Sequence, residues 1–266
     1  MGTQQFVDVT EIAGQKISAE QLERMRNRYV WASAFVGGKD VVEVGCGAGQ
    51  GLDFLARHAR SLKAGDISAE VLDRAKATYG ERFDLRVFDA AAMPWADASF
   101  DTVILFEAIY YLPDVDAFFA EVKRVLRPGG MLLIATANKD LYDFVPSPFS
   151  VAYYGVQELA ALGRRHGFTT EFWGFIDTQH VSLRQRVLRP VKSLASRLGL
   201  IPKTMRSKEL LKRLFFGRLV DMPSSISDVP VHDTAPTPLP GNAADKRFKV
   251  IYCAARLGET VAQAGK

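Results

Sequence analysis

The sequence lacks several features that mark special classes of protein. Its two cysteines, Cys46 and Cys253, are too few for a disulfide framework and are not spaced like metal ligands. No apolar run approaches the ~20 residues of a membrane-spanning helix, and the polar first twenty residues lack the apolar stretch of a secretory signal. We therefore expect a protein of the reducing cytoplasm that binds no metal.

Acidic residues are almost missing from one segment. Residues 181–220 carry eleven Lys or Arg and a single acid, Glu209, although the whole chain has a net charge of only +4. Three alternatives remain open for this segment: a solvated helical surface, docking on an anionic membrane or lipid-linked substrate, or attraction of an acidic acceptor such as a nucleotide-linked sugar. The scarcity of interleaved aromatic residues argues against nucleic acid as the partner.

What the sequence does have is an alternation of strand and helix patterns. This alternation predicts parallel βαβ units and therefore an α/β, doubly wound sheet, with residues 1–19 and the proline-rich segment 228–241 irregular. The "SAEQ" stretch that begins at Ser18 has the form of a capping box. Strands are predicted at 41–44, in 62–68, and at 83–90, 99–109, 131–137, 169–176 and 247–257, and helices at 18–35, 51–59, 68–80, 115–130 and 156–168.

The stretch "VVEVGCGAGQG" (41–51) follows the first strand with four glycines, each two residues apart. Glycine there lets the backbone approach a ligand closely, and ligands of open α/β sheets sit at the carboxyl ends of strands. The spacing does not fit the dinucleotide pattern G-x-G-x-x-G, and no Gly-Lys-Ser/Thr of a P-loop follows. What fits is acid-x-Gly-x-Gly-x-Gly, with Glu43 as the acid.

With this motif the sequence resembles the class I S-adenosylmethionine-dependent methyltransferases, from about Gly38 to Asn138 and more weakly to Phe175. The resemblance implies a Rossmann-like, seven-stranded sheet whose last strand is antiparallel, here with a helical insertion before that strand. It also implies S-adenosylmethionine as cofactor and S-adenosylhomocysteine as product. The residues expected around the cofactor are Tyr29, Glu43, Gly45, Cys46, Gly47, Gly49, Asp66, Ile67, Asp89, Ala90 and Phe106.

The resemblance gives several of these residues a role. Glu43 would hold the amino group, Asp66 the ribose hydroxyls, Asp89 the adenine amine, and Ile67 would pack on the adenine, while Tyr29 would cover the methionine end. Each residue also has a purely structural alternative. The glycines could form a tight turn, Asp66 could cap a helix, Asp89 could cap a turn, Glu43 could pair with a cation, and Tyr29 could be core.

Acceptor residues are expected beyond the fourth and fifth strands. Methyl transfer is an in-line displacement that needs alignment, and it needs a general base only when the acceptor holds its proton tightly. Glu107, Tyr110 and Tyr111 follow the fourth strand and are the candidate catalytic residues, although packing is the alternative for each. Lids and pocket walls form from loops such as the one after the fifth strand. The candidate substrate residues are Asn138, Tyr153, Tyr154 and His180.

These observations divide the chain into four predicted parts: a helical cap (1–36), a cofactor-binding core (37–178), a basic helical insertion with a proline-rich loop (179–241), and a final strand with a tail (242–266). The predicted function is methyl transfer to a small molecule, with a sugar or lipid-linked glycan precursor as the favoured acceptor. The location is cytoplasmic, with peripheral contact to an anionic membrane through 181–220 as an option. The rival functions are a non-catalytic cofactor-binding protein, an oxidoreductase, and a methyltransferase of RNA or protein.

Overall fold

The structure is a computed structural model, and it describes residues 12–179, 219–227, 229 and 234–259. The predicted helices of the basic segment, as well as His180, lie outside these described residues. Within them, no helix is both long and apolar enough to cross a membrane.

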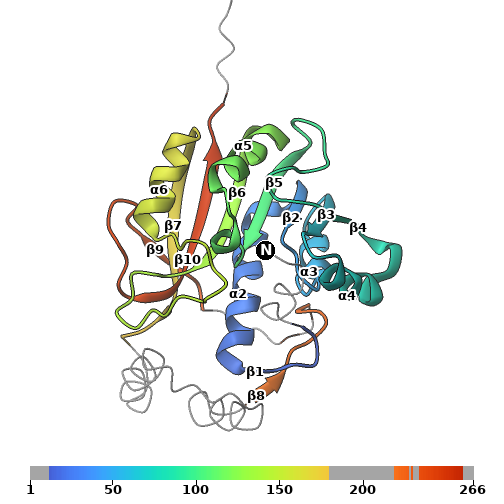
Figure 1. The fold of residues 1–266 in the computed structure, drawn as a ribbon, viewed down its shortest axis with the longest axis horizontal. Helices are drawn as coiled ribbons and strands as arrows, with labels where there is room; N and C mark the ends of the chain where they lie inside the picture. Colours follow the sequence, from blue (N-terminus) through green and yellow to red (C-terminus); the bar gives the residue numbers. More distant parts are fainter. Residues whose placement is uncertain (1–11, 180–218, 228, 230–233, 260–266) are drawn as a thin grey trace, which may run out of the picture.

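One eight-stranded sheet forms the centre of the molecule, in the order β4-β3-β2-β5-β6-β10-β7-β9 (Figure 1). β2, β3, β4, β5 and β6 run parallel, and β10 lies antiparallel between β6 and β7. The bounds are β2 Asp40–Val44, β3 Ser61–Asp66, β4 Asp84–Val87, β5 Phe100–Phe106, β6 Leu126–Ala137, β7 Phe168–Asp177, β9 Thr237–Leu239 and β10 Phe248–Leu257.

The seven predicted strands are all present, and the predicted fold is confirmed, including the antiparallel last strand. The eighth strand, β9, is a difference: residues 237–239 pair antiparallel with β7, although four prolines predicted a loop. A proline fits there because β9 is an edge strand, where a missing N–H leaves no inner ladder bond unmade. Residues 237–239 therefore belong to the sheet, although the predicted boundary between the insertion and the final strand lay at residue 242.

Helices cover both faces of the sheet. Side chains of α5 and α6 pack with Val42, Val103 and Leu132 on one face, whereas α2 packs with Ile104 and Leu133 on the other. The helices are α2 Ala19–Val36, α3 Leu52–Ala56, α4 Ala69–Tyr79, α5 Val115–Val125 and α6 Val156–Arg165, with short 3₁₀ turns η1 Gly80–Arg82 and η2 Ile109–Tyr111.

The helix boundaries follow local chemistry. The Ser18 hydroxyl accepts a hydrogen bond from the Gln21 N–H at 3.1 Å, as the predicted cap requires, and satisfies one free donor of α2. α5 ends at Val125, five residues before the predicted end, because 126–130 already belong to β6.

A small second sheet anchors the start of α2. β1 (Lys16–Ser18) pairs antiparallel with β8 (Leu219–Asp221), which begins at the end of the basic segment, where the described residues resume (Figure 1). The prediction that residues 1–19 are irregular is wrong for these three residues. The chain after β8 reaches the glycine loop, where the Ile226 N–H donates to the Gln50 carbonyl oxygen at 3.0 Å. This part of the predicted insertion thus packs directly on the core.

Candidate cofactor-binding and active site

A cavity of about 520 Å³ opens at the carboxyl ends of β2, β3 and β5, and we call it the cofactor cavity. β2 is the strand from which the chain first moves to β3 on one side and later to β5 on the other, so the cavity lies at the topological switch point. Its walls come from the strand ends and from α2. The lining residues include Gly45, Cys46, Gly47, Asp66, Ile67, Asp89, Ala90, Phe106, Glu107, Tyr110 and Tyr111 on the sheet side, and Tyr29 on α2.

The glycine loop is held in a conformation that favours glycine. Gly45, Gly47 and Gly49 have φ values of +69°, +57° and +80°, a region that other residues rarely adopt. A Cβ on Gly45 would lie 3.2 Å from the Ala108 Cβ, and one on Gly49 would lie 2.9 Å from Leu52 Cδ1. Of the predicted glycines, Gly45 and Gly47 line the cavity, whereas Gly49 supports the loop from behind.

The fourth glycine makes room for Tyr29. A Cβ on Gly51 would lie 2.0 Å from Tyr29 Cε1, so only glycine allows the tyrosine ring to occupy this position. The Tyr29 hydroxyl then donates a hydrogen bond to Glu43 Oε1 at 2.6 Å. Tyr29 therefore joins α2 to the acid of the glycine motif, and it is more than the plain core residue of the alternative interpretation.

Glu43 is an incompletely satisfied carboxylate. It is 1% exposed, and its Oε2 has no hydrogen-bond partner among the described residues. Burial raises the pKa of Glu43 to about 7, although the Tyr29 hydrogen bond and the Arg28 charge act in the opposite direction. A buried carboxylate oxygen without a partner fits the positively charged amino group of S-adenosylmethionine, so the residues present suit the cofactor that the resemblance implies.

Asp66 holds the glycine loop and faces the cavity at the same time. Its Oδ2 accepts from the Gly47 N–H and its Oδ1 from the Ser68 N–H, both at 3.0 Å. Burial raises its pKa despite these hydrogen bonds. Each oxygen keeps a further lone pair for the ribose hydroxyls. Beside it, Ile67 is 45% exposed on the cavity wall, as an apolar platform for an adenine ring requires.

Asp89 caps a turn and also lines the cofactor cavity. Its Oδ1 accepts from the Ala91 N–H at 2.8 Å, so the residue caps a turn. Its side chain is nevertheless exposed and lines the cofactor cavity next to the buried Ala90. Cys46 also lines the cavity, and burial raises the pKa of its thiol well above the ordinary value, so the thiol stays protonated.

Glu107 and Tyr110 form a polar pair on the acceptor side. The Tyr110 hydroxyl donates to Glu107 Oε2 at 3.0 Å, whereas the buried Glu107 Oε1 has no hydrogen-bond partner in the described chain and lies 3.8 Å from Arg24 Nε. Glu107 has a φ of +52°, which is unusual for a residue with a side chain and is stored strain at the end of β5. Burial raises the pKa of Tyr110 well above 10, so this phenol donates a proton in hydrogen bonds and does not act as a base.

Three of the predicted substrate residues, Asn138, Tyr153 and Tyr154, are described by the structure and are not among the residues that line the cofactor cavity. The Asn138 amide donates to the Asp245 and Phe248 carbonyl oxygens and to Asp245 Oδ2, so this buried side chain is a structural clamp, and its contact with a substrate stays a prediction. Tyr153 lies one layer behind, stacked on Tyr110 with ring centroids 4.9 Å apart. Tyr154 packs against the α5 and α6 side of the core.

Sequence analysis missed the contribution of α2 to the cavity. Gln21, Arg24, Met25 and Arg28 line it together with Tyr29. These positions are three, four or seven residues apart and therefore share one face of the helix. Counting back from Tyr29, Met25 lies four residues and Gln21 eight residues away, so a helical face drawn through Tyr29 could have identified these two. They give the cavity two guanidinium groups that face the carboxylates of the strand ends.

Comparisons with known proteins agree with this geometry. A family model described as "Methyltransferase domain" matches residues 42–134. A "Probable S-adenosylmethionine-dependent methyltransferase" of Mycolicibacterium smegmatis is 37% identical over 138 residues, which cover 50% of this chain and 53% of that protein. An "O-methyltransferase" of Pyrenophora dematioidea is 28% identical over 214 residues, 75% of this chain and 76% of that protein. The matches span about half the length of the first of these relatives.

A solved structure shares the fold over most of its length. It is a SAM-dependent methyltransferase of Thermotoga maritima, titled a possible histamine N-methyltransferase, and it covers 89% of this chain and 90% of its own with a TM-score of 0.57 and 13% identity. At that identity the likeness supports the fold alone. The family match therefore identifies residues 42–134 as a methyltransferase domain, and the fold, the glycine loop and the unpartnered Glu43 oxygen are those expected of the class I S-adenosylmethionine-dependent type.

Proposed function

We propose that this protein transfers a methyl group from S-adenosylmethionine to a hydroxyl oxygen of a small molecule. The single observation that carries the proposal is Glu107. Its backbone is held at a φ of +52°, and its Oε1, which has no hydrogen-bond partner in the described chain, belongs to a residue of the cavity wall. A hydroxyl acceptor needs such a carboxylate, because its proton must be accepted while the new bond to carbon forms.

The surrounding residues suit this role for Glu107. Tyr110 donates to Oε2 and fixes the carboxylate plane, which leaves Oε1 for the acceptor hydroxyl. Arg24 places a positive charge 3.8 Å from Oε1. The bound cofactor supplies the methyl group and leaves as S-adenosylhomocysteine. The residues of the chain align the acceptor oxygen with that methyl group and exclude water, which is where most of the catalysis of such a displacement arises.

The class of acceptor is the finer part of the proposal. The relative from Pyrenophora is named an O-methyltransferase, which supports oxygen as the accepting atom. Tyr110 and Tyr111 offer aromatic faces beside the Glu107 carboxylate, and Gln21 offers an amide on the opposite wall. Aromatic faces next to hydroxyl-binding groups suit a sugar, so a sugar or lipid-linked glycan precursor stays our favoured acceptor.

The test separates cofactor binding from methyl transfer. Purified protein is incubated with methyl-labelled S-adenosylmethionine and a fractionated cell extract, and cofactor affinity is measured separately by calorimetry. We expect label in a small-molecule or lipid fraction, a loss of about 10²–10⁴-fold in rate for Glu107→Gln, and little change in its cofactor affinity. Label in RNA or protein would overturn the acceptor class. Cofactor binding without label in any fraction would favour the non-catalytic rival.

Membrane contact is a separate proposal that rests on the charge of residues 181–220. Reversing the charge of Arg184, Arg186, Arg189 and Lys192 should leave cofactor affinity unchanged. It should reduce sedimentation with anionic vesicles or turnover of an anionic acceptor. If both measurements stay unchanged, the segment is only a solvated surface.

A further inference from the structure

α2 separates two cavities of similar size. Its Tyr29 face lines the cofactor cavity, and its other face lines a second cavity of about 520 Å³, which we call the outer cavity. The helix contributes residues at the three- and four-residue spacing of a single face. The outer cavity is lined by Ala19, Leu22, Glu23, Arg26, Asn27, Val30, Trp31 and Ala34 of α2, and by Val220, Val229, Thr234, Ala235 and Pro236.

The walls of the outer cavity are mainly apolar. Leu22, Val30 and Trp31 of α2 face Val220 and Val229 across it. Trp31 is fixed in place because it stacks on Tyr252 at 4.9 Å and packs against Trp173 at 5.6 Å. A preformed apolar concavity with a few polar groups is the usual form of a small-molecule site.

Two buried donors in this apolar wall have no acceptor. Arg26 is 8% exposed and its Nε has no hydrogen-bond partner, and Trp31 is 7% exposed and its Nε1 has none either, within the described chain. None of the ion pairs described here includes Arg26. A buried donor without an acceptor costs about 1–3 kcal/mol, and a charged one costs more, so two such groups on residues that line one cavity need an explanation.

The remaining polar groups of the outer cavity do not supply an acceptor. The Asn27 amide donates to the Thr234 carbonyl oxygen at 2.9 Å, and its oxygen accepts from the Tyr252 hydroxyl at 3.1 Å. Glu23 is exposed, so its carboxylate is solvated at the open side of the cavity. Arg26 and Trp31 therefore both line the outer cavity, and each has one donor without a hydrogen-bond partner in the described chain.

We propose that the outer cavity binds an apolar molecule that carries one carboxylate. The apolar chain of the ligand would fill the space between α2 and the facing residues Val220, Val229 and Pro236. Its carboxylate would accept hydrogen bonds from the Arg26 guanidinium and the Trp31 indole N–H, which suits the planar donor geometry of arginine. This site is separate from the cofactor cavity and does not depend on the proposed methyl transfer.

Octanoate is the probe, and octan-1-ol is its matched uncharged control. The readout is the NMR resonance of the Trp31 indole N–H, assigned by its absence from Trp31→Phe. We expect a saturable shift of this resonance with octanoate and binding of octan-1-ol that is weaker by about tenfold or more. Arg26→Met should weaken octanoate binding by a similar factor.

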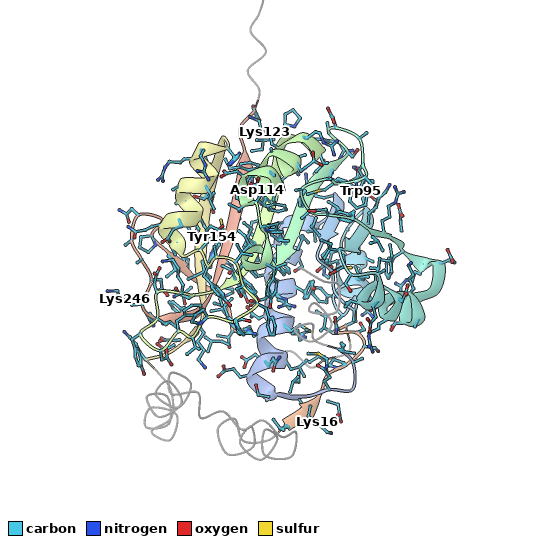
Figure 2. The ribbon with its side chains drawn as sticks, viewed as in Figure 1. Lys16, Trp95, Asp114, Lys123, Tyr154 and Lys246 are labelled. Carbon is cyan, nitrogen blue, oxygen red and sulfur yellow. The ribbon has the colours of Figure 1, made fainter. Side chains whose placement is uncertain are left out.

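Two further measurements distinguish a binding role from a structural one. If Arg26 serves the ligand, Arg26→Met keeps or raises the thermal midpoint, because a buried charge is removed, and it loses the stabilisation by octanoate. Lys123→Met is the control for the loss of one helix cation, because Lys123 lies on α5, far from Lys16 of β1, the strand that leads into α2 (Figure 2).

The proposal is overturned by any of three results. These are the absence of a saturable shift with octanoate, equal affinity for octan-1-ol, and unchanged octanoate affinity in folded Arg26→Met.

Discussion

The two ends of strand β2 each carry a carboxylate, and these two carboxylates differ in their hydrogen-bond partners and in the direction of their pKa shifts. Asp40, at its start, accepts hydrogen bonds from Arg60 and from the Ser61 hydroxyl, and these hold the pKa of Asp40 well below its usual range. Glu43, near its end, is buried with one oxygen unpartnered, and burial raises its pKa to about 7. Three residues separate a fully paired carboxylate from one that lacks a partner.

β5 repeats the contrast. Burial acts to raise the pKa of Asp101 at its start, but hydrogen bonds from the Asp40 N–H and from Arg127 outweigh burial and lower it. Glu107, directly after its end, keeps Oε1 without a hydrogen bond. The amino edge of the sheet thus uses its charges to hold strands together, whereas the carboxyl edge leaves bonding capacity that a ligand can use.

The largest effect should come from Gly51→Ala, which should disrupt packing at the carboxyl edge of the sheet and leave the amino edge intact. The new Cβ would collide with the Tyr29 ring, push α2 outward and separate Tyr29 from Glu43. We expect a loss of about 3 kcal/mol in the free energy of unfolding, together with cofactor affinity reduced by more than tenfold. Chemical denaturation and calorimetry measure these. Gly37→Ala, where a Cβ meets nothing within 4 Å, is the control; equal stability of the two variants would contradict the packing argument.

Asp66→Ala tests a carboxylate that serves both the loop and the ligand. Removing it should weaken cofactor binding by roughly 1.5–3 kcal/mol, the scale of hydrogen bonds to a charged group, while the domain stays folded. Asp89→Ala is the matched comparison, and its effect should be smaller because Asp89 is exposed. Unchanged affinity in a folded Asp66→Ala protein would refute the ribose assignment.

The pH dependence of cofactor affinity sharpens the contrast through Glu43. Only the ionised carboxylate attracts the ammonium group, so affinity should rise by about tenfold per pH unit as the pH approaches 7 from below. The stability of the cofactor-free protein changes in the opposite direction. The pKa of Glu43 in the folded state lies above the ordinary 4.5. The stabilisation of the folded protein by protonated Glu43 is therefore complete below pH 4.5 and disappears as the pH rises through about 7. Glu43→Gln should flatten both profiles in calorimetry and thermal unfolding; a profile unchanged by it would assign the titration to another group.

The smallest effect should come from the amino edge. Arg60→Gln removes an exposed partner of Asp40, and exposed ion pairs contribute little and are screened by salt. We expect the thermal midpoint to fall by a few degrees at most at low salt and not at all at high salt, with cofactor affinity unchanged. A loss of cofactor affinity in this variant would show that the two edges are coupled.

Local spacing was enough to predict the sheet and the glycine loop. A strand followed by acid-x-Gly-x-Gly-x-Gly places Glu43, Gly45 and Gly47 by backbone geometry within a few residues, and Gly45 and Gly47 line the cofactor cavity. Asp66 follows the same logic, since the carboxyl ends of adjacent parallel strands meet at one edge.

Residue spacing in the sequence could not predict contacts between distant segments. Asn138 follows β6 and so was expected near the acceptor, yet its amide binds Asp245, 107 residues later. β1 forms only because β8 pairs with it, and Arg24 and Arg28 enter the cavity because α2 docks across the strand ends. The outer cavity has the same origin, since α2 forms one of its walls and the far later residues Val220, Val229 and Thr234–Pro236 form the other.

The way α2 is anchored also determines when the site can be completed during synthesis. Glu20 pairs with Lys249, 229 residues later, and Asn27 accepts from Tyr252 across 225 residues. A ribosome must therefore release the chain through β10 before α2 finds its place, and contacts so distant in sequence form slowly. The cofactor cavity therefore stays incomplete until β10 has been synthesised. Truncation before β10 should accordingly abolish cofactor binding, although β10 lines no part of the cofactor cavity.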